Sequence, residues 1–246
     1  MYANIQLDRS DGIATLTLNR PEKLNAYTQE MGEEITHAFR ALRGDADVRV
    51  VILTGAGRGF CAGVDLDHLK AHQAAGAEAK GPKLGEEDFI RELPLELIAY
   101  PKPVIAAING AAIGVGITMA LPCDIRIAAA GVKLGFTFAA LGILPGLGST
   151  HLLPRLVGPA VARELALSAR VFLAEEAAAI GLVNKVVPGD ALMNEARAMA
   201  SAMAAHDPAV LAAAKQVLDF GAAHDMSEAM RNEQEQSAAL RELKAG

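Results

Sequence analysis

The chain has 246 residues, of which 52% are hydrophobic and 21% charged, and its formal net charge is −6. This composition excludes an intrinsically disordered chain, and an acidic balance without a basic block gives no support to nucleic-acid binding. The length fits one large domain, or one domain with an appendage. Cys61 and Cys123 form no disulfide framework or metal-ligand spacing, so we expect a reducing, cytoplasmic location.

The N-terminal part of the chain predicts a hairpin, a helix and a buried strand, in that order. Residues 5–7 and 13–18 have the alternation of a hairpin. An amphipathic helix follows, capped by Thr28 and ended at Gly44. The short apolar run at residues 48–54 is typical of a buried strand.

Two stretches share a layout in which a buried strand leads into a glycine-rich turn and then a helix. The first joins the strand at 48–54 to a helix over 64–70, and the second joins a strand at 104–108 to a helix over 115–121. The glycines of the turns are Gly55, Gly57, Gly59, Gly63, Gly110, Gly114 and Gly116. Because the first N–H groups of a helix lack intrahelical partners, two converging helix starts can form an oxyanion hole.

The second of these units contains an uncharged run at residues 104–121, which lies at the lower limit of transmembrane length. Asn109 and three glycines interrupt the run, and prolines flank it. A buried strand followed by a buried helix explains this pattern better, so we expect no membrane insertion.

The remaining elements predict a β/α core over residues 1–188 and a helical region over residues 189–246. Residues 71–88 carry no clear periodicity and are expected to form an excursion from the core. We expect strands at 123–128 and 183–187, a rigid loop at 142–148, and helices at 86–99, 190–205, 208–220 and 227–244. The helical region exposes too much apolar surface to stand alone, so it should pack on the core or on another subunit.

Few side chains in this pattern could act as acids, bases or ligands. Asp65 is the only acid in either glycine turn, and it could act as an acid–base group or satisfy N–H groups of the helix. His151 follows the 142–148 loop and could reach a pocket or remain on the surface. His68 and His72 share a helix face, but no third ligand lies nearby, so we predict no metal site.

A dinucleotide-binding turn is the weakest of the functional interpretations. The turn at residues 55–60 begins as G-x-G-x-x-G would, but Phe60 occupies the position of the third glycine. A nicotinamide-dependent dehydrogenase therefore has only a broken motif in its support.

The sequence resembles the crotonase (enoyl-CoA hydratase/isomerase) superfamily from residue 3 to about residue 240, and five segments carry the resemblance. The stretch NRPEKLNA resembles the first CoA loop of that family, and GFCAGVDL resembles its F-C-A-G-x-D-L turn. The central motif, KPVIAAINGAAIG, and the stretches CDIRIA and GLVNKVV also fit. The five segments occupy residues 19–26, 59–66, 102–114, 123–128 and 181–187.

This resemblance implies an α/β fold, a spiral of repeated ββα units with a C-terminal helical trimerisation region, assembled as a homotrimer or a hexamer. It implies an acyl-CoA thioester as the ligand and no permanently bound cofactor. By motif position, the backbone N–H groups of Val64 and Val115 would hold the thioester carbonyl. The implied substrate- and CoA-binding residues are Lys23, Leu24, Ala26, Ala62, Gly63, Asp65, Leu66, Gly114 and Leu144.

The chain departs from the family pattern at the acid–base positions. The two glutamates that handle water addition in the hydratases are replaced by Thr118 and Phe138, and an acid used in some isomerases is replaced by Gly146. Threonine is no strong base at neutral pH, and phenylalanine has no proton to transfer.

The expected protein is therefore an acyl-CoA enzyme that stabilises a thioester enolate and whose acid–base group is unusual, with Asp65, His151 or water alone as candidates. Hydration, isomerisation or hydrolysis could each follow from that intermediate. The alternative is a non-catalytic acyl-CoA binder that kept the fold and lost the chemistry.

Overall fold

The computed structural model describes residues 2–75 and 85–245, and the strands in this part form two sheets. The six-stranded sheet consists, in spatial order, of β1 (Ile5–Ser10), β2 (Ile13–Leu18), β3 (Val50–Gly55), β5 (Val104–Ile108), β7 (Ile125–Ala129) and β10 (Lys185–Val187). The four-stranded sheet consists of β4 (Gly59–Cys61), β6 (Ala111–Ile113), β8 (Lys133–Gly135) and β9 (Val171–Leu173).

The two sheets are built from repeated pairs of strands. In each of the pairs β3–β4, β5–β6 and β7–β8, the first strand joins the large sheet and the second joins the small one. Neighbours from β2 to β10 in the large sheet and from β4 to β8 in the small sheet run parallel. The antiparallel pairs are β1–β2 and β8–β9. This repetition confirms the predicted α/β spiral of ββα units.

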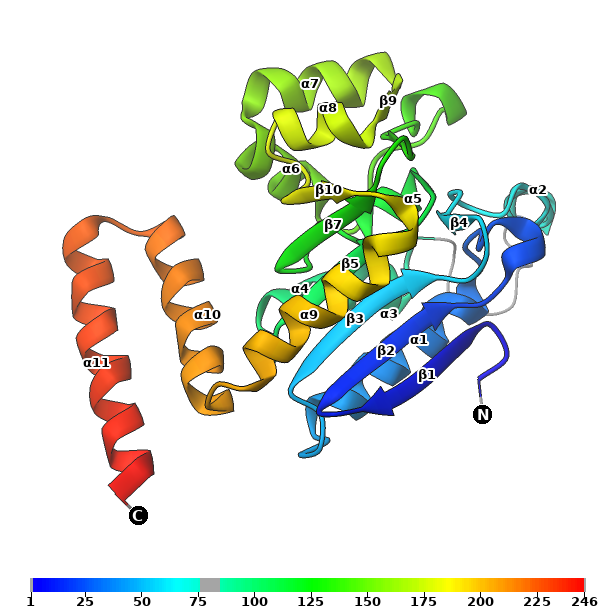
Figure 1. The fold of residues 1–246 in the computed structure, drawn as a ribbon. Coiled ribbons are helices and arrows are strands. Elements are labelled where there is room, and N and C mark those ends of the chain that lie inside the picture. The colour runs from blue at the N-terminus through cyan, green and yellow to red at the C-terminus, as the bar shows by residue number, and fades with distance from the viewer. Residues whose placement is uncertain (1, 76–84, 246) are drawn as a thin grey trace.

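Helices connect and cover these strands (Figure 1). In chain order the helices of the core are α1 (Gln29–Arg43), α2 (Leu66–Ala75), α3 (Asp88–Arg91), α4 (Leu93–Ile98), α5 (Val115–Thr118), α6 (Ser149–Val157), α7 (Pro159–Ser168) and α8 (Ala174–Ala179). The last three helices are α9 (Leu192–Ala204), α10 (Pro208–Ala223) and α11 (Met226–Ala245). Single 3₁₀ turns occur at Pro21–Lys23, Ala139–Leu141 and Gly189–Ala191.

Elements with strong local signals lie where the sequence predicts them. The hairpin strands and the strand Val104–Ile108 are present, and the first helix begins after Thr28, whose hydroxyl accepts a hydrogen bond from the Met31 N–H. That helix ends at Gly44, as predicted. A cap at one end and a glycine at the other are local signals, which explains why these bounds could be read from the chain.

Short elements that depend on pairing were predicted wrongly. Each glycine-rich turn contains a three-residue strand, β4 or β6, and the helix after the second turn ends at Thr118 instead of residue 121. The single helix expected over 86–99 is divided into α3 and α4. The strand β9 (Val171–Leu173) was not predicted from the sequence. Helix α2 extends to Ala75, into the expected excursion, and residues 76–84 of that stretch lie outside the described residues.

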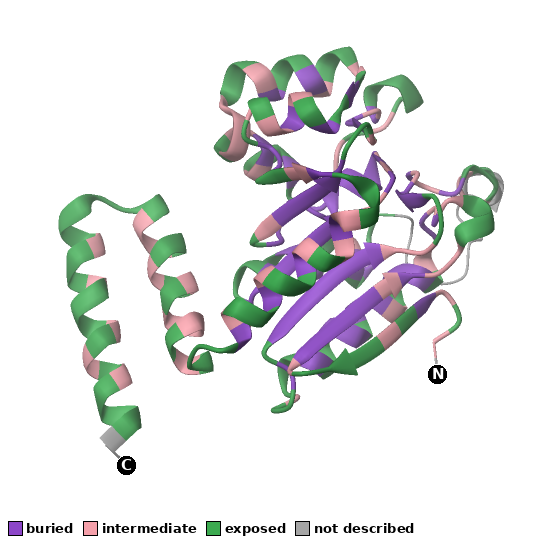
Figure 2. Ribbon diagram, viewed as in Figure 1, coloured by how far each residue is buried: buried purple, intermediate pink, exposed green. Residues whose placement is uncertain are grey.

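The large sheet is buried between helices on both of its faces (Figure 2). Helix α1 buries one stripe of apolar residues, at Met31, Ile35, Phe39 and Leu42. Helix α9 covers the opposite face and packs with Val50, Ile52 and the other inward residues of β3, β5 and β7 through Leu192, Ala196 and Ala200. Fully burying one large aliphatic side chain stabilises the fold by about 1.5–3 kcal/mol, so both layers fix the position of the sheet.

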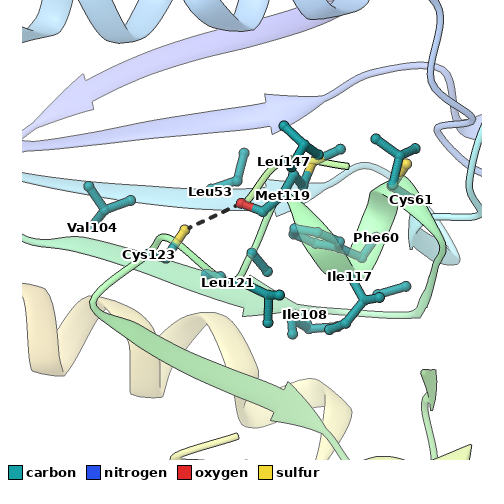
Figure 3. Packing of buried hydrophobic residues seen from close by; sticks show 14 of the residues in the cluster. Leu53, Phe60, Cys61, Val104, Ile108, Ile117, Met119, Leu121, Cys123 and Leu147 are labelled. Carbon is teal, nitrogen blue, oxygen red and sulfur yellow. Dashed lines mark hydrogen bonds between the residues drawn. The ribbon is translucent and has the colours of Figure 1, made fainter. Parts of the chain in front are cut away.

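Buried side chains also fill the space beneath the second glycine turn (Figure 3). Ile117 and Met119 lie in the same cluster as Phe60 of β4 and Ile108 of β5. The Cys123 thiol approaches the Met119 carbonyl oxygen at 3.9 Å. The turn that carries Val115 is therefore supported from below by packed apolar residues.

Helices α10 and α11 pack against each other and extend away from the sheets (Figure 1). No residue of α10 is buried. Lys215 of α10 connects this pair to the core, because its ammonium group bonds to the Asp124 carboxylate at 2.8 Å and the Lys102 carbonyl at 3.1 Å. Among the described helices, none combines the length and the hydropathy that crossing a membrane requires.

Candidate active site

A cavity of about 410 Å³ lies where the ββα units β3–β4–α2 and β5–β6–α5 meet, which are called the first and the second unit below. Its wall combines the turns that follow β4 and β6, the starts of α2 and α5, the residues around Glu87, and the segment between Thr137 and Leu147. Most of the lining is apolar, and both Val64 and Val115 belong to it. The structure thus brings together the two residues that the sequence predicted as oxyanion-hole donors.

Parallel pairing of β4 with β6 sets the two turns side by side, with Gly59 opposite Ala111 and Cys61 opposite Ala112. Gly116 makes this close approach possible, since a Cβ atom there would lie 2.1 Å from the Cys61 carbonyl oxygen. Gly63 adopts a φ of +107°, which side-chain-bearing residues rarely reach. The glycines in these turns are therefore required by contact between the units and by backbone geometry.

Tyr27 and Val64 form a short parallel β-bridge that does not use the Val64 N–H. The Tyr27 N–H donates to the Gly63 carbonyl at 2.8 Å, and the Asp65 N–H donates to the Tyr27 carbonyl at 2.9 Å. This parallel bridge uses the groups on either side of Val64 and none of its own. The peptide N–H of Val64 therefore faces away from Tyr27.

Val115 is the first residue of α5, and its N–H has no acceptor within the helix. Gly114 precedes it with a φ of +55° and provides no side-chain cap. The Gly114 N–H itself donates to the Gly135 carbonyl at 2.8 Å, which ties the turn to β8. The start of α5 therefore presents an uncapped N–H group at a residue that lines the cavity.

The three positions at which the sequence resemblance led us to expect carboxylates line the cavity, and none of them carries one. Thr118 is fully buried, and its hydroxyl donates to the Val115 carbonyl at 3.3 Å. Phe138 contributes an aromatic ring, and Gly146 contributes no side chain. A Cβ atom on Gly146 would meet only the Ile90 side chain, at 3.5 Å, which is an ordinary contact.

Asp65 does not belong to the residues that line the cavity. Its carboxylate accepts hydrogen bonds from the N–H groups of Asp67 at 3.0 Å and His68 at 3.3 Å, at the start of α2. It also pairs with Arg20 at 3.0 Å. Burial opposes ionisation, but the hydrogen bonds from Arg20 and the backbone lower the pKa of Asp65 below its ordinary value. Asp65 thus caps a helix, as the second of the two sequence interpretations expected.

His151 also lies outside the cavity lining, on the exposed first turn of α6. Its Nδ1 atom is 2.8 Å from the Arg155 guanidinium, one helical turn further on. The structure therefore places neither sequence-derived acid–base candidate among the lining residues.

Glu87 is the lining residue that sequence reasoning missed. Only 2% of its surface is exposed, and it is the only carboxylate among the described residues that line the cavity. Its Oε1 accepts a hydrogen bond from the Tyr27 hydroxyl at 2.5 Å, and its Oε2 accepts one from the Gly85 N–H at 2.6 Å. In the sequence it stands in a run of three acids, a pattern typical of a solvated surface.

Tyr27 lines the same cavity and is itself held from several sides. Its ring stacks on Phe89 at a centroid distance of 4.8 Å, and a Cβ atom on Gly32 would lie 2.8 Å from the Tyr27 hydroxyl oxygen. Burial raises the pKa of Tyr27 well above its ordinary value, and the hydrogen bond to Glu87 raises it further. The hydroxyl therefore keeps its proton and remains a donor to Glu87.

The predicted CoA-binding residues divide into two groups. Ala62, Gly63, Leu66, Gly114 and Leu144 line the cavity. Asp65, Lys23, Leu24 and Ala26 lie outside it, the last three on the loop around the turn Pro21–Lys23. This loop adjoins β4, because the Ala62 N–H donates to the Leu24 carbonyl at 3.0 Å. The Lys23 ammonium group is half exposed and pairs with Asp67 at 3.2 Å.

Among the described residues, no group of three or more histidine, cysteine, aspartate or glutamate side chains could hold a metal ion. Of the two histidines noted in the sequence, His68 and His72, the side chain of His72 lies outside the described part.

Comparison with known proteins assigns the fold and the turns to one family. A model of enoyl-CoA hydratase/isomerase matches residues 8–242. The chain belongs to the enoyl-CoA hydratase/isomerase family. Among solved structures similar to this family member is an enoyl-CoA hydratase from Bacillus anthracis, with a TM-score of 0.87 and 35% identity over 96% of this chain and 90% of that one.

Curated relatives of this family member carry both hydratase and isomerase names. A short-chain-enoyl-CoA hydratase from Clostridium acetobutylicum is 39% identical over 94% of this chain and 87% of its own length. A 1,2-epoxyphenylacetyl-CoA isomerase from Escherichia coli is 40% identical over 85% of this chain and 79% of its own length. Because these names include both a hydratase and an isomerase, they assign no single reaction to this chain.

Proposed function

We propose that the cavity holds the acyl group of an acyl-CoA thioester and that the N–H groups of Val64 and Val115 bind its carbonyl oxygen. The observation that carries this proposal is that one cavity is lined by both residues, each at a turn between a short strand and a helix. Two N–H donors aimed at one oxygen stabilise the negative charge that develops there when the thioester becomes an enolate. No permanently bound cofactor is needed for that step.

The CoA moiety is proposed to leave the cavity along the loop that carries Lys23, Leu24 and Ala26. The Leu24 carbonyl of this loop accepts a hydrogen bond from the Ala62 N–H, directly before Gly63 and Val64. The half-exposed ammonium group of Lys23, which pairs with Asp67, stands beside this path, and an ammonium group suits phosphate. Leu66 is half exposed and Leu144 is 88% exposed, so both offer apolar surface at the rim of the cavity.

The proposed reaction is of the enoyl-CoA hydratase/isomerase type, without the two-glutamate route for water addition. Thr118 and Phe138 occupy the positions of those glutamates, and neither side chain can activate water as a base. Isomerisation through an enolate needs only one group that removes and returns a proton. The cavity therefore favours isomerisation over hydration.

Assembly into a homotrimer or a hexamer is proposed to bury the apolar surface of α10 and α11. Leu218, Met226 and Met230 are exposed on these helices, which extend away from the sheets. A helical pair with this much exposed apolar surface gains stability by packing against another copy.

The buried, unbridged thiols of Cys61 and Cys123 support a reducing, cytoplasmic compartment.

A replacement at Val115 tests the oxyanion hole directly. Proline is tolerated at the first position of a helix, so Val115→Pro removes the N–H donor with little strain, whereas Val115→Ala keeps it. We expect Val115→Pro to slow exchange of the α-protons of butyryl-CoA in D₂O by about 10²–10³-fold relative to Val115→Ala. Equal exchange rates in the two variants would contradict the proposal.

The second candidate function, a non-catalytic acyl-CoA binder, draws on the replacement of both glutamates. Calorimetry with butyryl-CoA would then show binding, while enoyl-, dienoyl- and β-keto thioesters would remain unchanged. Hydration of crotonyl-CoA by the double variant Thr118→Glu, Phe138→Glu, measured beside wild type, tests whether this fold can support the two-glutamate route. Turnover of any of these thioesters by the wild-type protein excludes the binder.

A further inference from the structure

The cavity holds one carboxylate in a position that the sequence did not reveal. Glu87 is buried, lines the same cavity as Val64 and Val115, and is the only carboxylate among the described lining residues. Apart from Tyr27, the other described lining residues have no side chain that transfers protons at neutral pH. A substrate carbon next to the oxyanion hole therefore has few partners for a proton.

From this arrangement we infer that Glu87 is the catalytic base of an enoyl-CoA double-bond isomerase, with Tyr27 as its positioning residue. The inference rests on the proposed binding of an acyl-CoA thioester at Val64 and Val115. It replaces Asp65 and His151, which the structure places outside the cavity lining. A buried carboxylate with a fixed orientation, in the same cavity as a pair of backbone donors, is the arrangement that proton transfer next to a carbonyl requires.

Tyr27 links the two halves of this site. Its main chain bonds to Gly63 and Asp65, on either side of Val64, and its hydroxyl donates to Glu87. The Gly85 N–H holds the second oxygen of Glu87. One residue thus fixes both the backbone around an oxyanion donor and the orientation of the carboxylate, so the distance between them is set by a rigid ring.

The reaction can be written with one proton and no other reactant. For a 3-enoyl thioester, the Glu87 carboxylate accepts a proton from carbon 2, and the C–H electron pair forms a dienolate whose oxygen lies at the Val64 and Val115 N–H groups. The protonated Glu87 then returns the proton to carbon 4. The carbonyl re-forms, the double bond between carbons 3 and 4 is lost, and a double bond between carbons 2 and 3 appears. The product is an isomer of the substrate.

Hydration would need more proton-transfer groups than this single carboxylate. Water addition requires a group that activates the water and a group that protonates carbon 2, and in the described lining Glu87 is the single carboxylate. The positions of the missing carboxylates, Thr118, Phe138 and Gly146, provide no second one. A single carboxylate that moves one proton between two carbons fits the residues present.

The decisive variant is Glu87→Gln, with Glu86→Gln as the matched control, because Glu86 is the exposed neighbour of Glu87. Three quantities are measured on the full chain: binding of butyryl-CoA by calorimetry, α-proton exchange of butyryl-CoA in D₂O, and conversion of 3-hexenoyl-CoA followed by the absorbance of the conjugated product. Glu87→Gln should bind butyryl-CoA within about threefold of wild type. Its exchange and isomerisation rates should fall at least about 100-fold, and Glu86→Gln should match wild type.

The outcomes separate this inference from the proposed function. If wild type does not bind butyryl-CoA, the proposed function fails and the role of Glu87 fails with it. If wild type binds and exchanges protons but Glu87→Gln exchanges them equally fast, only the assignment of Glu87 is overturned. Thermal unfolding of each variant shows whether it is folded, and Glu87→Asp, which keeps the carboxylate, should recover part of the lost rate in a folded protein.

Tyr27→Phe tests the positioning role. Loss of the hydroxyl removes one of the two hydrogen bonds that orient the Glu87 carboxylate, while the ring stays stacked on Phe89. We expect kcat for 3-hexenoyl-CoA to fall about tenfold, with KM changed less than about twofold, because misplacement of a catalytic group affects the chemical step. An unchanged kcat in the folded variant would remove Tyr27 from the mechanism.

Discussion

The first and second ββα units, β3–β4–α2 and β5–β6–α5, share one layout, but only the first has a side-chain cap at the start of its helix. In the first unit, the carboxylate of Asp65 accepts the free N–H groups of α2 and pairs with Arg20. In the second unit, α5 begins after Gly114 with no side-chain cap, and its first N–H belongs to a residue that lines the cavity. A repeated backbone layout therefore fixes where a donor stands, while the side chain at the turn decides whether the helix start is already satisfied.

The two units also differ in their surroundings. Helix α5 is buried throughout, whereas α2 lies at the edge of the molecule and has exposed positions such as Leu66 and Asp67. Buried elements gain their position from packing on all sides, and edge elements depend more on caps and ion pairs. This difference predicts different responses to mutation in the two units.

Gly116→Ala should have the largest effect, because it drives the two units apart. A Cβ atom at 2.1 Å from the Cys61 carbonyl oxygen forces the backbone to shift. We expect the free energy of unfolding to fall by about 3 kcal/mol, measured by urea denaturation. Gly44→Ala is the control, since a Cβ atom at Gly44 meets nothing within 4 Å and should change that free energy by less than about 1 kcal/mol. Equal stability of the two variants would show that the units do not rely on this contact.

Asp65→Asn should have a smaller effect and should be confined to the first unit. It removes the charge that caps α2 and leaves Arg20 without its ion-pair partner, so we expect a loss of about 1–3 kcal/mol of unfolding free energy near pH 7. Asp67→Asn removes an exposed pair with Lys23 and should cost less than about 0.5 kcal/mol.

The pH dependence of this contribution has a definite sign. The pKa of Asp65 is lowered in the folded protein relative to its ordinary value of 3.8, so its stabilisation is present above about pH 4 and is lost as the pH falls further. Stability curves of wild type and Asp65→Asn should therefore converge below pH 4. Curves that stay parallel down to strongly acidic pH would refute the role of the charged cap.

The smallest difference between the two units is expected in the reactivity of their cysteine thiols, because both Cys61 and Cys123 are buried. Burial raises the pKa of Cys61, beside the first turn, to about 12, and it does the same for Cys123, after the second. Both thiols should therefore resist alkylation in the native protein at pH 8 and react fully after unfolding. Rapid labelling of native Cys61 would reveal an accessible thiolate near the cavity.

Local signals explain which parts of the fold were predicted. Thr28 and Gly44 delimit a helix through groups that act within one turn, and the apolar run Val104–Ile108 is long enough to be a strand wherever it pairs. The strands β4, β6 and β9 have three residues each and exist because a neighbouring strand completes their hydrogen bonds. A window of sequence does not contain that neighbour, so these strands were missed.

The candidate site divides in the same way. Val64 and Val115 could be named in advance because the family resemblance marks them by motif position, at the two helix starts that follow the glycine turns. Glu87 could not, because its role depends on Tyr27, which lies 60 residues earlier in the chain. Asp65 and His151 looked chemically suitable, but their side chains are engaged by Arg20 and Arg155.

By itself the sequence determined the family, the repeated layout and the absence of carboxylates at Thr118, Phe138 and Gly146, since residue identity and short-range spacing are properties of the chain alone. Only the tertiary structure decided which acid lines the cavity. Proximity between Glu87, Tyr27 and the turn at Val64 arises when the sheets pair and the helices pack, and no local pattern records which distant residues that packing brings together.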